Sequence, residues 1–297
     1  MNDRMETSVP DIYAAGDAVQ VKHYVTGNDA LISLAGPANK HGRIIADNIC
    51  GGDSRYLGSQ GSSVIKVFDM TAATTGINET NAKKSGLEVD TVILSPMSHA
   101  GYYPGGKVMT MKVVFEKETY RLLGAQIIGY EGVDKRIDVL ATVIHAGLKA
   151  TQLKDLDLAY APPYSSAKDP VNMAGFMIDN IAKGTLKQWH LEDMDKISRD
   201  KSVVLLDVRT VGEFNRGHMD GFKNIPVDEL RERINEIEKG KPVYLICQSG
   251  LRSYIASRIL EGNGYETYNF SGGFRFYDAV ANDHALIERS YACGMDY

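Results

Sequence analysis

The sequence is poor in cysteine, and its few cysteines are scattered. Only Cys50, Cys247 and Cys293 occur in 297 residues, without a CxxC pair or any other paired spacing. This spacing excludes a disulfide framework and a zinc site built on cysteine pairs, and it suits a reducing compartment. We therefore expect a cytoplasmic protein with no metal site, and we assign no role to Cys293.

The sequence also lacks an excess of positive charge and any long apolar run. Its 33 Lys and Arg residues are outnumbered by 38 Asp and Glu residues, which gives a formal charge of −5. A basic surface for nucleic acid is therefore not expected. No apolar stretch is long enough to cross a membrane, and the N-terminus has no signal-peptide core. The length and a hydrophobic content of 43% predict a soluble globular protein of roughly two domains.

One stretch, 243–260, combines a reactive side chain with a turn that can support it. The β-branched run at 243–246 predicts a strand that delivers Cys247, and a helical pattern starts near Arg252. In such a unit the N–H groups of the loop and the N-terminal end of the helix dipole point into one small bowl. Together with the guanidinium of Arg252, they would stabilise an anion on Cys247. The loop between these two residues consists of Gln248, Ser249, Gly250 and Leu251.

The length of this loop separates two chemistries. Four residues lie between Cys247 and Arg252, whereas phosphatases that hold a phosphate in this kind of loop carry five. The smaller bowl fits a single terminal sulfur better than a tetrahedral oxyanion, so a cysteine persulfide is favoured over a phosphocysteine. The alternative is a buried strand-end cysteine without chemistry, and the Gly and Arg that follow Cys247 make this the weaker interpretation.

Four short motifs in order over about a hundred residues resemble the rhodanese (sulfurtransferase) family. They are LLDVR at 205–209, Gly217-His218 followed by NIP at 224–226, the Cys247 loop, and SGGF at 271–274. The resemblance implies a persulfide on Cys247. We expect Asp207 and Arg209 to order the loop electrostatically rather than to react.

Strand and helix patterns alternate around these motifs. Strands are expected at 203–207, 243–246 and 267–270, and helices at 227–239, 252–261 and 277–287. Such alternation predicts a parallel sheet with helices on both faces. Cys247 would then lie at the C-terminal end of a strand, where such sheets bind ligands.

The first fifty residues carry a different motif. The segment 9–17 reads as a short strand that ends in Gly16 and Asp17, and a helix is expected to start near Pro37. A carboxylate at a strand end can bind a sugar or ribityl hydroxyl, and the preceding glycine lets a ligand approach the backbone. The segment resembles the second flavin-binding motif of the pyridine nucleotide-disulfide oxidoreductases. This resemblance implies FAD contacts at Gly16, at Asp17 and at the helix start, where Pro37 and Ala38 lie.

The rest of such a flavin domain is not found in this sequence. No GxGxxG follows a predicted strand, and the resembled enzymes carry that fingerprint, a redox-active cysteine and an NAD(P)H domain upstream of the flavin motif. We therefore expect the C-terminal part of a longer enzyme, a truncated gene product or an expressed fragment. By itself this chain should not complete reductase turnover, and the sequence leaves open whether it holds FAD.

Residues 61–184 read as an α+β domain. Strands are expected at 63–69, 91–94, 108–116 and 122–129, and helices at 78–84, 133–148 and 169–183. The domain resembles the dimerisation domain that closes the oxidoreductase family, which implies a homodimer. Its YAPPYS segment holds Tyr160 and Tyr164 beside two stiffening prolines, and the resemblance places the segment at the dimer interface. The residues leave two uses equally open, packing or hydroxyl chemistry on a sulfur group.

The expected fold is therefore α/β and α+β in three parts. Residues 1–60 would be the residual C-terminal part of an FAD-binding domain, 61–184 a dimerisation domain, and 190–297 a rhodanese-like α/β domain with a parallel sheet. The order resembles the rhodanese-fused coenzyme A-disulfide reductases. That resemblance implies reduction of CoA disulfides, persulfides or polysulfides by NAD(P)H through FAD, with sulfur carried on Cys247.

Three rival hypotheses remain beside this one. The chain alone could be a dimeric sulfurtransferase without flavin or reductase activity, acting on small thiols, disulfides or polysulfides. A docking module without catalysis is the second rival, and it is disfavoured because docking needs neither Cys247 nor Arg252. A phosphatase or arsenate reductase is weaker still because of the loop length.

Overall fold

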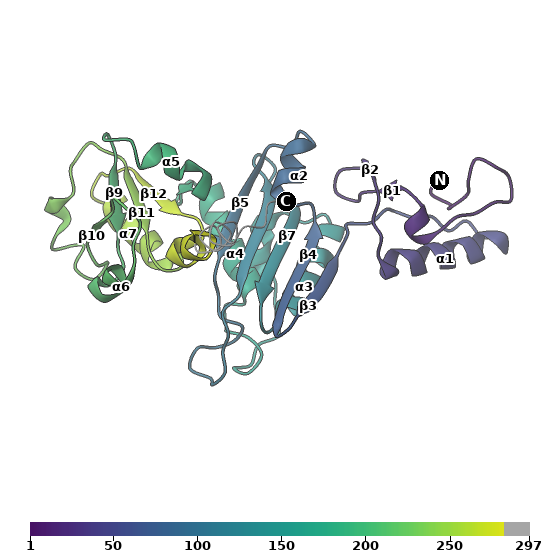
Figure 1. Cartoon of the computed structure of the whole chain (residues 1–297), viewed down its shortest axis with the longest axis horizontal. Coiled ribbons are helices and arrows are strands. Elements are labelled where there is room, and N and C mark those ends of the chain that lie inside the picture. The colour runs from purple at the N-terminus through teal and green to yellow at the C-terminus, as the bar shows by residue number, and fades with distance from the viewer. Residues whose placement is uncertain (282–297) are drawn as a thin grey trace, which may run out of the picture. The chain divides into compact units, whose positions relative to one another are not determined.

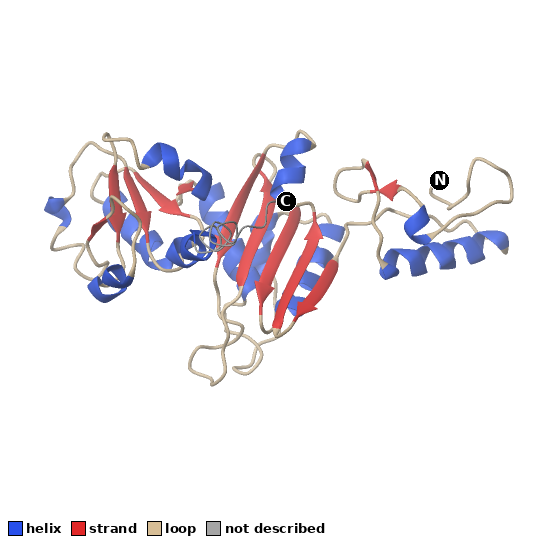
Figure 2. Ribbon diagram, viewed as in Figure 1, coloured by secondary structure: helices blue, strands red, loops and turns tan. Residues whose placement is uncertain are grey.

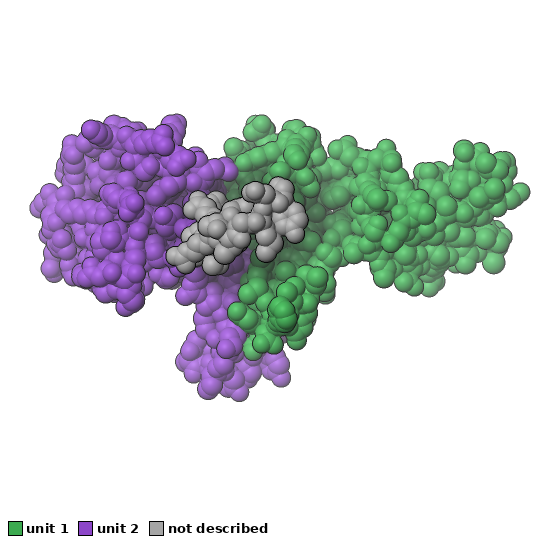
Figure 3. Space-filling model, viewed as in Figure 1, with its two compact units in different colours: residues 1–91, 112–150 green, residues 92–111, 151–297 purple. Residues whose placement is uncertain are grey.

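The computed structural model describes residues 1–281, and two compact units make up the chain (Figure 3). Unit 1 consists of residues 1–91 and 112–150, and unit 2 of residues 92–111 and those from 151 on. The predicted division at 60 and 184–190 follows sequence relationships rather than these units, and it stays a prediction. Residues 273–281 are helical, and the remainder of the helix expected at 277–287, like Cys293, lies outside the described residues.

The N-terminal part of unit 1 is a set of short elements beside one long helix. They are η1 (Gly16–Ala18), the antiparallel pair β1 (Val21–Lys22) and β2 (Asp29–Ala30), and α1 (Ala35–Ile49) (Figure 1). The helix expected near Pro37 is confirmed, because this proline is the third residue of α1. The strand expected at 9–17 is wrong. Asp11 has a φ of +61° and the chain turns there, which leaves a single bridge between Glu6 and Tyr13.

A five-stranded sheet forms the next layer, in the order β3-β4-β7-β6-β5 (Figure 2). Its strands are β3 (Ser63–Val67), β4 (Met70–Gly76), β5 (Val89–Leu94), β6 (Thr110–Glu116) and β7 (Leu122–Gly129). The helix α3 (Val133–His145) packs on β4 and β7 through an apolar face that includes Ile137, Leu140 and Ile144. Four of these strands and this helix match the expected pattern, and β4 is an addition.

Two helix starts carry the caps that their sequences suggest. Asn78 accepts a hydrogen bond from the Asn81 N–H at the start of α2 (Glu79–Lys84). Asp169 accepts one from the Val171 N–H at the start of α4 (Pro170–Ala182), where Pro170 takes the first position. A capping side chain replaces a partner that the helix cannot supply, which fixes where each helix begins.

The predicted parallel sheet is confirmed, with strand order β10-β9-β11-β12-β8 and every pairing parallel. Its strands are β8 (Gln188–Trp189), β9 (Val204–Asp207), β10 (Lys223–Asn224), β11 (Val243–Ile246) and β12 (Thr267–Phe270). Trp189 of β8 is buried against Phe270 with ring centroids 4.4 Å apart. Its indole N–H also donates to the Leu245 carbonyl. This residue therefore anchors an edge strand.

The helices of this sheet agree with expectation in one case and disagree in another. The helix expected at 252–261 is α7 (Leu251–Glu261). The helix expected at 227–239 is wrong, because these residues form successive turns with the short η4 (Ile234–Glu236). Leu230 and Ile237 are buried all the same. Their apolar spacing therefore reflects contacts of the turns with the core rather than a helix. The remaining elements are η2 (Ala150–Asp155), η3 (Leu191–Asp193), α5 (Met194–Ile197) and α6 (Val211–Arg216).

Residues 1–281 contain neither a membrane-spanning helix nor a cluster of metal-binding side chains. Within that range no helix combines the length and apolar character needed to cross a bilayer. The same residues contain no group of three or more His, Cys, Asp or Glu side chains placed to hold a metal ion.

Candidate active site

Cys247 follows β11 directly and is buried, with 1% of its surface exposed. Two donors lie within hydrogen-bond distance of its sulfur, the Gly250 N–H at 3.1 Å and the Ser253 hydroxyl at 3.2 Å. The Ser253 hydroxyl also lies 3.1 Å from the Gly250 carbonyl, so its one hydrogen is shared between the sulfur and that oxygen. Gly250 has a φ of +99°, a left-handed conformation that glycine adopts without strain, and this turns its N–H back toward the sulfur. The two donors hold the sulfur in a fixed position within the loop.

The outer side of the Cys247 loop rests on the turn after β12. The Phe274 N–H donates to the Cys247 carbonyl at 2.8 Å, and the Arg275 N–H donates to the Gln248 carbonyl at 3.1 Å. A Cβ atom on Gly273 would come within 2.6 Å of the Ser249 nitrogen. This glycine is therefore needed for the close approach of the two backbones.

Arg252 has a partner that the sequence did not suggest. Its guanidinium forms two hydrogen bonds of 2.7 Å to the carboxylate of Glu213, which lies in α6. These bonds lower the pKa of Glu213 to about 2 and raise the pKa of Arg252 above its usual value, with a further electrostatic contribution from Cys247. The charge of Arg252 is thus shared between Glu213 and the loop, rather than directed at Cys247 alone.

Asp207 and Arg209 form a buried ion pair beneath the loop. The guanidinium of Arg209 bonds the Asp207 carboxylate at 2.7 to 3.1 Å and reaches the Gln248 side chain at 3.4 Å. It also lies over the ring of Phe274 at 3.8 Å. These contacts join the first strand motif to the Cys247 loop, as an ordering role requires.

Tyr160 and Tyr164 lie elsewhere in unit 2, and neither lines the described pocket beside the Cys247 loop. Both side chains are exposed, by 46% and 73%. The Tyr160 hydroxyl lies 2.8 Å from that of Tyr102, and this hydrogen bond raises the pKa of Tyr160. Tyr102 was not singled out in the sequence.

The predicted flavin contacts are brought together at the start of α1. The Gly16 N–H donates to His41 Nδ1 at 3.2 Å, and a Cβ on Gly16 would lie 3.8 Å from that of Ala38. Asp17 is exposed beside them. His41 is buried, its Nε2 has no hydrogen-bond partner within residues 1–281, and burial lowers its pKa. No side chain caps the first turn of α1, where Pro37 lies.

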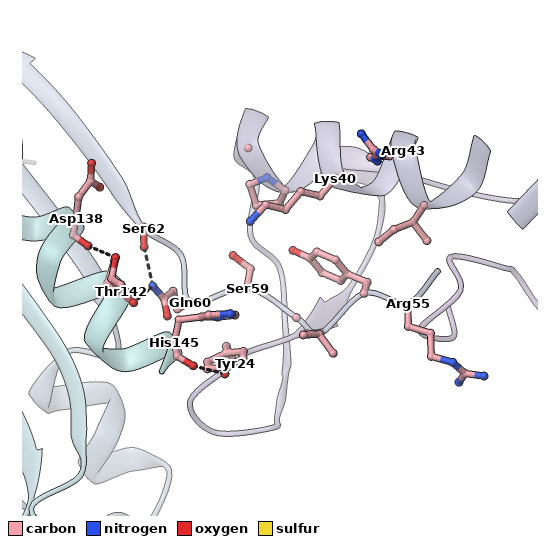
Figure 4. A pocket seen from close by; sticks show the side chains of 17 residues that line it. Tyr24, Lys40, Arg43, Arg55, Ser59, Gln60, Ser62, Asp138, Thr142 and His145 are labelled. Atoms are coloured by element: carbon pink, nitrogen blue, oxygen red, sulfur yellow. Dashed lines mark hydrogen bonds between the residues drawn. The ribbon is translucent and has the colours of Figure 1, made fainter. Parts of the chain in front are cut away.

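Pro37 also lines a cavity of about 820 Å³ in unit 1, which Gly16, Asp17 and Ala38 do not line (Figure 4). Lys40 and Arg43 come from α1 on one side and Asp138, Thr142 and His145 from α3 on the other. The Tyr24 hydroxyl donates to the His145 carbonyl at 2.8 Å across its floor. Of the four predicted residues, Pro37 alone lines this cavity.

Ser253 contacts the Cys247 sulfur and Glu213 pairs with Arg252, and sequence reasoning singled out neither residue. Ser253 lies one residue after the Arg252 that closes the loop, and its contact with the sulfur spans six residues. Glu213 lies 39 residues before Arg252. A T-x-x-E pattern at Thr210 did signal a helix start there, since both side chains form a capping box.

Two family models match the chain and together define its class. The pyridine nucleotide-disulphide oxidoreductase dimerisation domain matches residues 62–170, and the rhodanese-like domain matches residues 190–279. The chain thus combines an oxidoreductase dimerisation domain with a rhodanese-like domain, which confirms the resemblance found in the sequence.

Individual relatives match different shares of the chain. The chain is 39% identical over 170 residues to the NAD(P)H sulfur oxidoreductase (CoA-dependent) of Pyrococcus abyssi, covering 57% of this chain and 38% of that protein. The reduced CoADR-RHD of Bacillus anthracis superposes with a TM-score of 0.92 at 46% identity, over 95% of this chain and 51% of that one. A NAD-dependent persulfide reductase from A. fulgidus gives 0.85 at 41% identity, over 93% and 50%. The chain therefore spans two fifths to one half of the length of these proteins.

Proposed function

We propose that the chain is part of an FAD- and NAD(P)H-dependent reductase of CoA disulfides, persulfides or polysulfides, in which Cys247 carries sulfane sulfur as a persulfide. The observation that carries this proposal is the pair of hydrogen bonds to the Cys247 sulfur from Gly250 and Ser253. The relatives support the reductase part, since one is named a CoA-dependent NAD(P)H sulfur oxidoreductase and another an NAD-dependent persulfide reductase.

The sulfur-transfer step needs no oxidant or reductant. The thiolate of Cys247 attacks the outer sulfur of a donor R–S–SH. A new S–S bond forms to the Cys247 sulfur, the old S–S bond breaks, and its electron pair leaves with RS⁻. An acceptor thiolate then attacks the same outer sulfur, which restores the Cys247 thiolate and releases a new persulfide.

We assign the loop residues the task of holding that persulfide. The N–H groups of Gln248, Ser249, Gly250 and Leu251 would bind the terminal sulfur as hydrogen-bond donors. Arg252 would add positive charge while Glu213 fixes its direction. This assignment rests on the geometry around Cys247 and on the loop length.

The N-terminal segment would contribute one edge of the flavin site. The exposed Asp17 and the uncapped first turn of α1, with Pro37 and Ala38, offer a carboxylate for a hydroxyl and N–H groups for an anionic ring edge. Bound FAD would supply electrons from NAD(P)H for cleavage of an S–S bond. These residues fit that group in part, since Gly16 and His41 hold the segment against α1.

Homodimerisation and a cytoplasmic location complete the proposal. The family model for residues 62–170 describes a dimerisation domain, and Tyr160 and Tyr164 would lie at that interface with one hydroxyl near the sulfur chemistry. Sedimentation of the purified chain should give twice the monomer mass. The monomer mass alone would contradict the dimer.

The test of sulfur transfer is Cys247→Ser with Cys50→Ser as the control, since Cys50 is exposed and lies far along the chain. We expect transfer from polysulfide or thiosulfate to a thiol to fall at least about a hundredfold in Cys247→Ser and to stay unchanged in Cys50→Ser. Equal rates in wild type and Cys247→Ser would contradict the proposal. Transfer without bound flavin or NAD(P)H oxidation would favour the second function, a dimeric sulfurtransferase acting alone.

A further inference from the structure

A second pocket lies beside the Cys247 loop but outside the bowl. It measures about 360 Å³, and residues 249–251 form one of its walls. The other walls come from α4 and from residues 94–96, all within unit 2. Neither Cys247 nor Arg252 lines this pocket. The sulfur-transfer step therefore does not use this pocket, which we call the loop pocket.

Two residues that line the loop pocket each have a buried polar atom without a hydrogen-bond partner among residues 1–281. The atoms are Oγ of Ser95 and Oδ1 of Asn269. Asn269 is 3% exposed, and its other amide atom donates to the Gly250 carbonyl at 3.1 Å. Buried polar atoms are nearly always hydrogen bonded, because an unpaired one has lost its contacts with water and gained nothing in return. Asn269 Oδ1 is an unpaired acceptor, and a hydrogen-bond donor on a bound molecule would satisfy it.

The remaining lining combines an apolar wall, one cation and three polar residues. Met173, Phe176 and Met177 of α4 face the pocket, and Lys168 lies two residues before α4. The polar residues are Asn180, Ser249 and Tyr254. Methionine side chains adapt to irregular apolar shapes. An apolar body, a hydrogen-bond donor and a negative group would match the α4 wall, Asn269 and Lys168 in turn.

We propose that the loop pocket binds a small amphipathic anion that carries an N–H or O–H donor. Its apolar body contacts the three α4 side chains, its donor bonds Asn269 Oδ1 and Ser95 Oγ, and its negative group pairs with Lys168. The site requires no sulfur chemistry and so goes beyond the function proposed above. It adjoins that function, since Asn269 supports the Gly250 carbonyl while the Gly250 N–H bonds the Cys247 sulfur.

The experiment is a fluorescence titration with 8-anilinonaphthalene-1-sulfonate, which has an aromatic body, one N–H donor and a sulfonate. The variants are Lys168→Met and Ser95→Ala. The control is Lys183→Met, because Lys183 follows the same helix and does not line the pocket. We expect saturable binding of one probe per chain. Lys168→Met should weaken it about tenfold, Ser95→Ala a few fold, and Lys183→Met should leave it unchanged.

Thermal unfolding separates the proposed site from a water-filled void. Removing an unpaired buried hydroxyl should leave the free chain as stable as wild type or slightly more so, while the stabilisation given by the probe falls in Ser95→Ala. Binding that is not saturable, or that is equal in wild type, Lys168→Met and Ser95→Ala, would overturn the proposal. Loss of sulfur transfer in Cys247→Ser with intact probe binding would leave it standing, so the two proposals fail separately.

Discussion

The Cys247 loop and the Gly16–Asp17 segment are two candidate sites built in opposite ways. Cys247 is 1% exposed, and its loop is bonded to the turn after β12, to Asn269 and to Ser253. Asp17 is exposed in the middle of a three-residue helix, and the strands nearest to it in sequence have two residues each. The first site has its own supporting contacts, whereas the second offers single groups at a surface. Sulfur transfer should therefore depend on the first and be indifferent to the second.

The largest effect is expected where two backbones touch. Gly273→Ala places a Cβ within 2.6 Å of the Ser249 nitrogen at a φ of +68°, so unfolding free energy should fall by about 3 kcal/mol. Gly240→Ala is the matched control, because Gly240 has a φ of +83° and nothing within 4 Å of its Cβ position. Urea unfolding measures both. Equal losses of unfolding free energy in the two variants would show that the contact between Gly273 and the loop does not affect stability.

The next effect concerns the ion pair that holds Arg252. Because the pKa of Glu213 is lowered from 4.5 to about 2, the folded state is stabilised at pH values above 4.5 and loses this stabilisation as the pH falls toward 2. Glu213→Gln should therefore cost on the order of 2 kcal/mol at pH 7 and almost nothing at pH 2. Urea unfolding at a series of pH values follows the difference.

Glu236→Gln provides the comparison for this ion pair. The pKa of Glu236 is also lowered to about 2, chiefly by its hydrogen bond to Arg233. Glu236 is 40% exposed and Glu213 is 21% exposed, whereas the two arginines differ little, and solvent weakens the more exposed pair. The variant should lose much less stability. An equal, pH-independent loss in both variants would contradict the account of Arg252.

A smaller effect is expected from the hydroxyl on the Cys247 sulfur. Ser253→Ala removes one of the two donors to the Cys247 sulfur. Losing about 1 kcal/mol of transition-state stabilisation should slow sulfur transfer about fivefold. Ser257→Ala is the control one turn along α7, since its hydroxyl donates to the Tyr254 carbonyl instead. A rate unchanged in Ser253→Ala would remove this residue from the site.

The smallest effect sharpens the contrast between the two sites. Asp17→Ala should leave the sulfur-transfer rate unchanged within about twofold, because replacing an exposed side chain seldom disturbs a buried site such as the Cys247 loop. The same variant should weaken any binding of FAD, measured by retained visible absorbance after gel filtration. A loss of sulfur transfer in Asp17→Ala would show that the two sites are not independent.

Patterns within one element were readable from the sequence. The β-branched run before Cys247, the helix after Arg252 and the cap at Asn78 each depend on neighbours a few residues away, and the structure has all three. The parallel sheet followed from the alternation of strands and helices. The motifs around Cys247 also led to the rhodanese-like domain.

Features set by tertiary contacts were not readable. The strand β4 has the sequence MTAATTG, whose small side chains give no apolar alternation, and it is held by pairing with β3 and β7. The region 227–239 has helical spacing but forms turns that bury Leu230 and Ile237. The pairing of Arg252 with Glu213 joins two helices 39 residues apart. Such pairings depend on how elements meet, which local spacing does not encode.

The most direct test of the central claim is the intact mass of the purified chain before and after polysulfide treatment, recorded with its visible absorbance. The account predicts a gain of one sulfur that is absent in Cys247→Ser. A flavin band near one per chain would add that the Gly16–Asp17 segment holds FAD. No gain in wild type, or the same gain in Cys247→Ser, would contradict the claim that the Cys247 loop carries a persulfide.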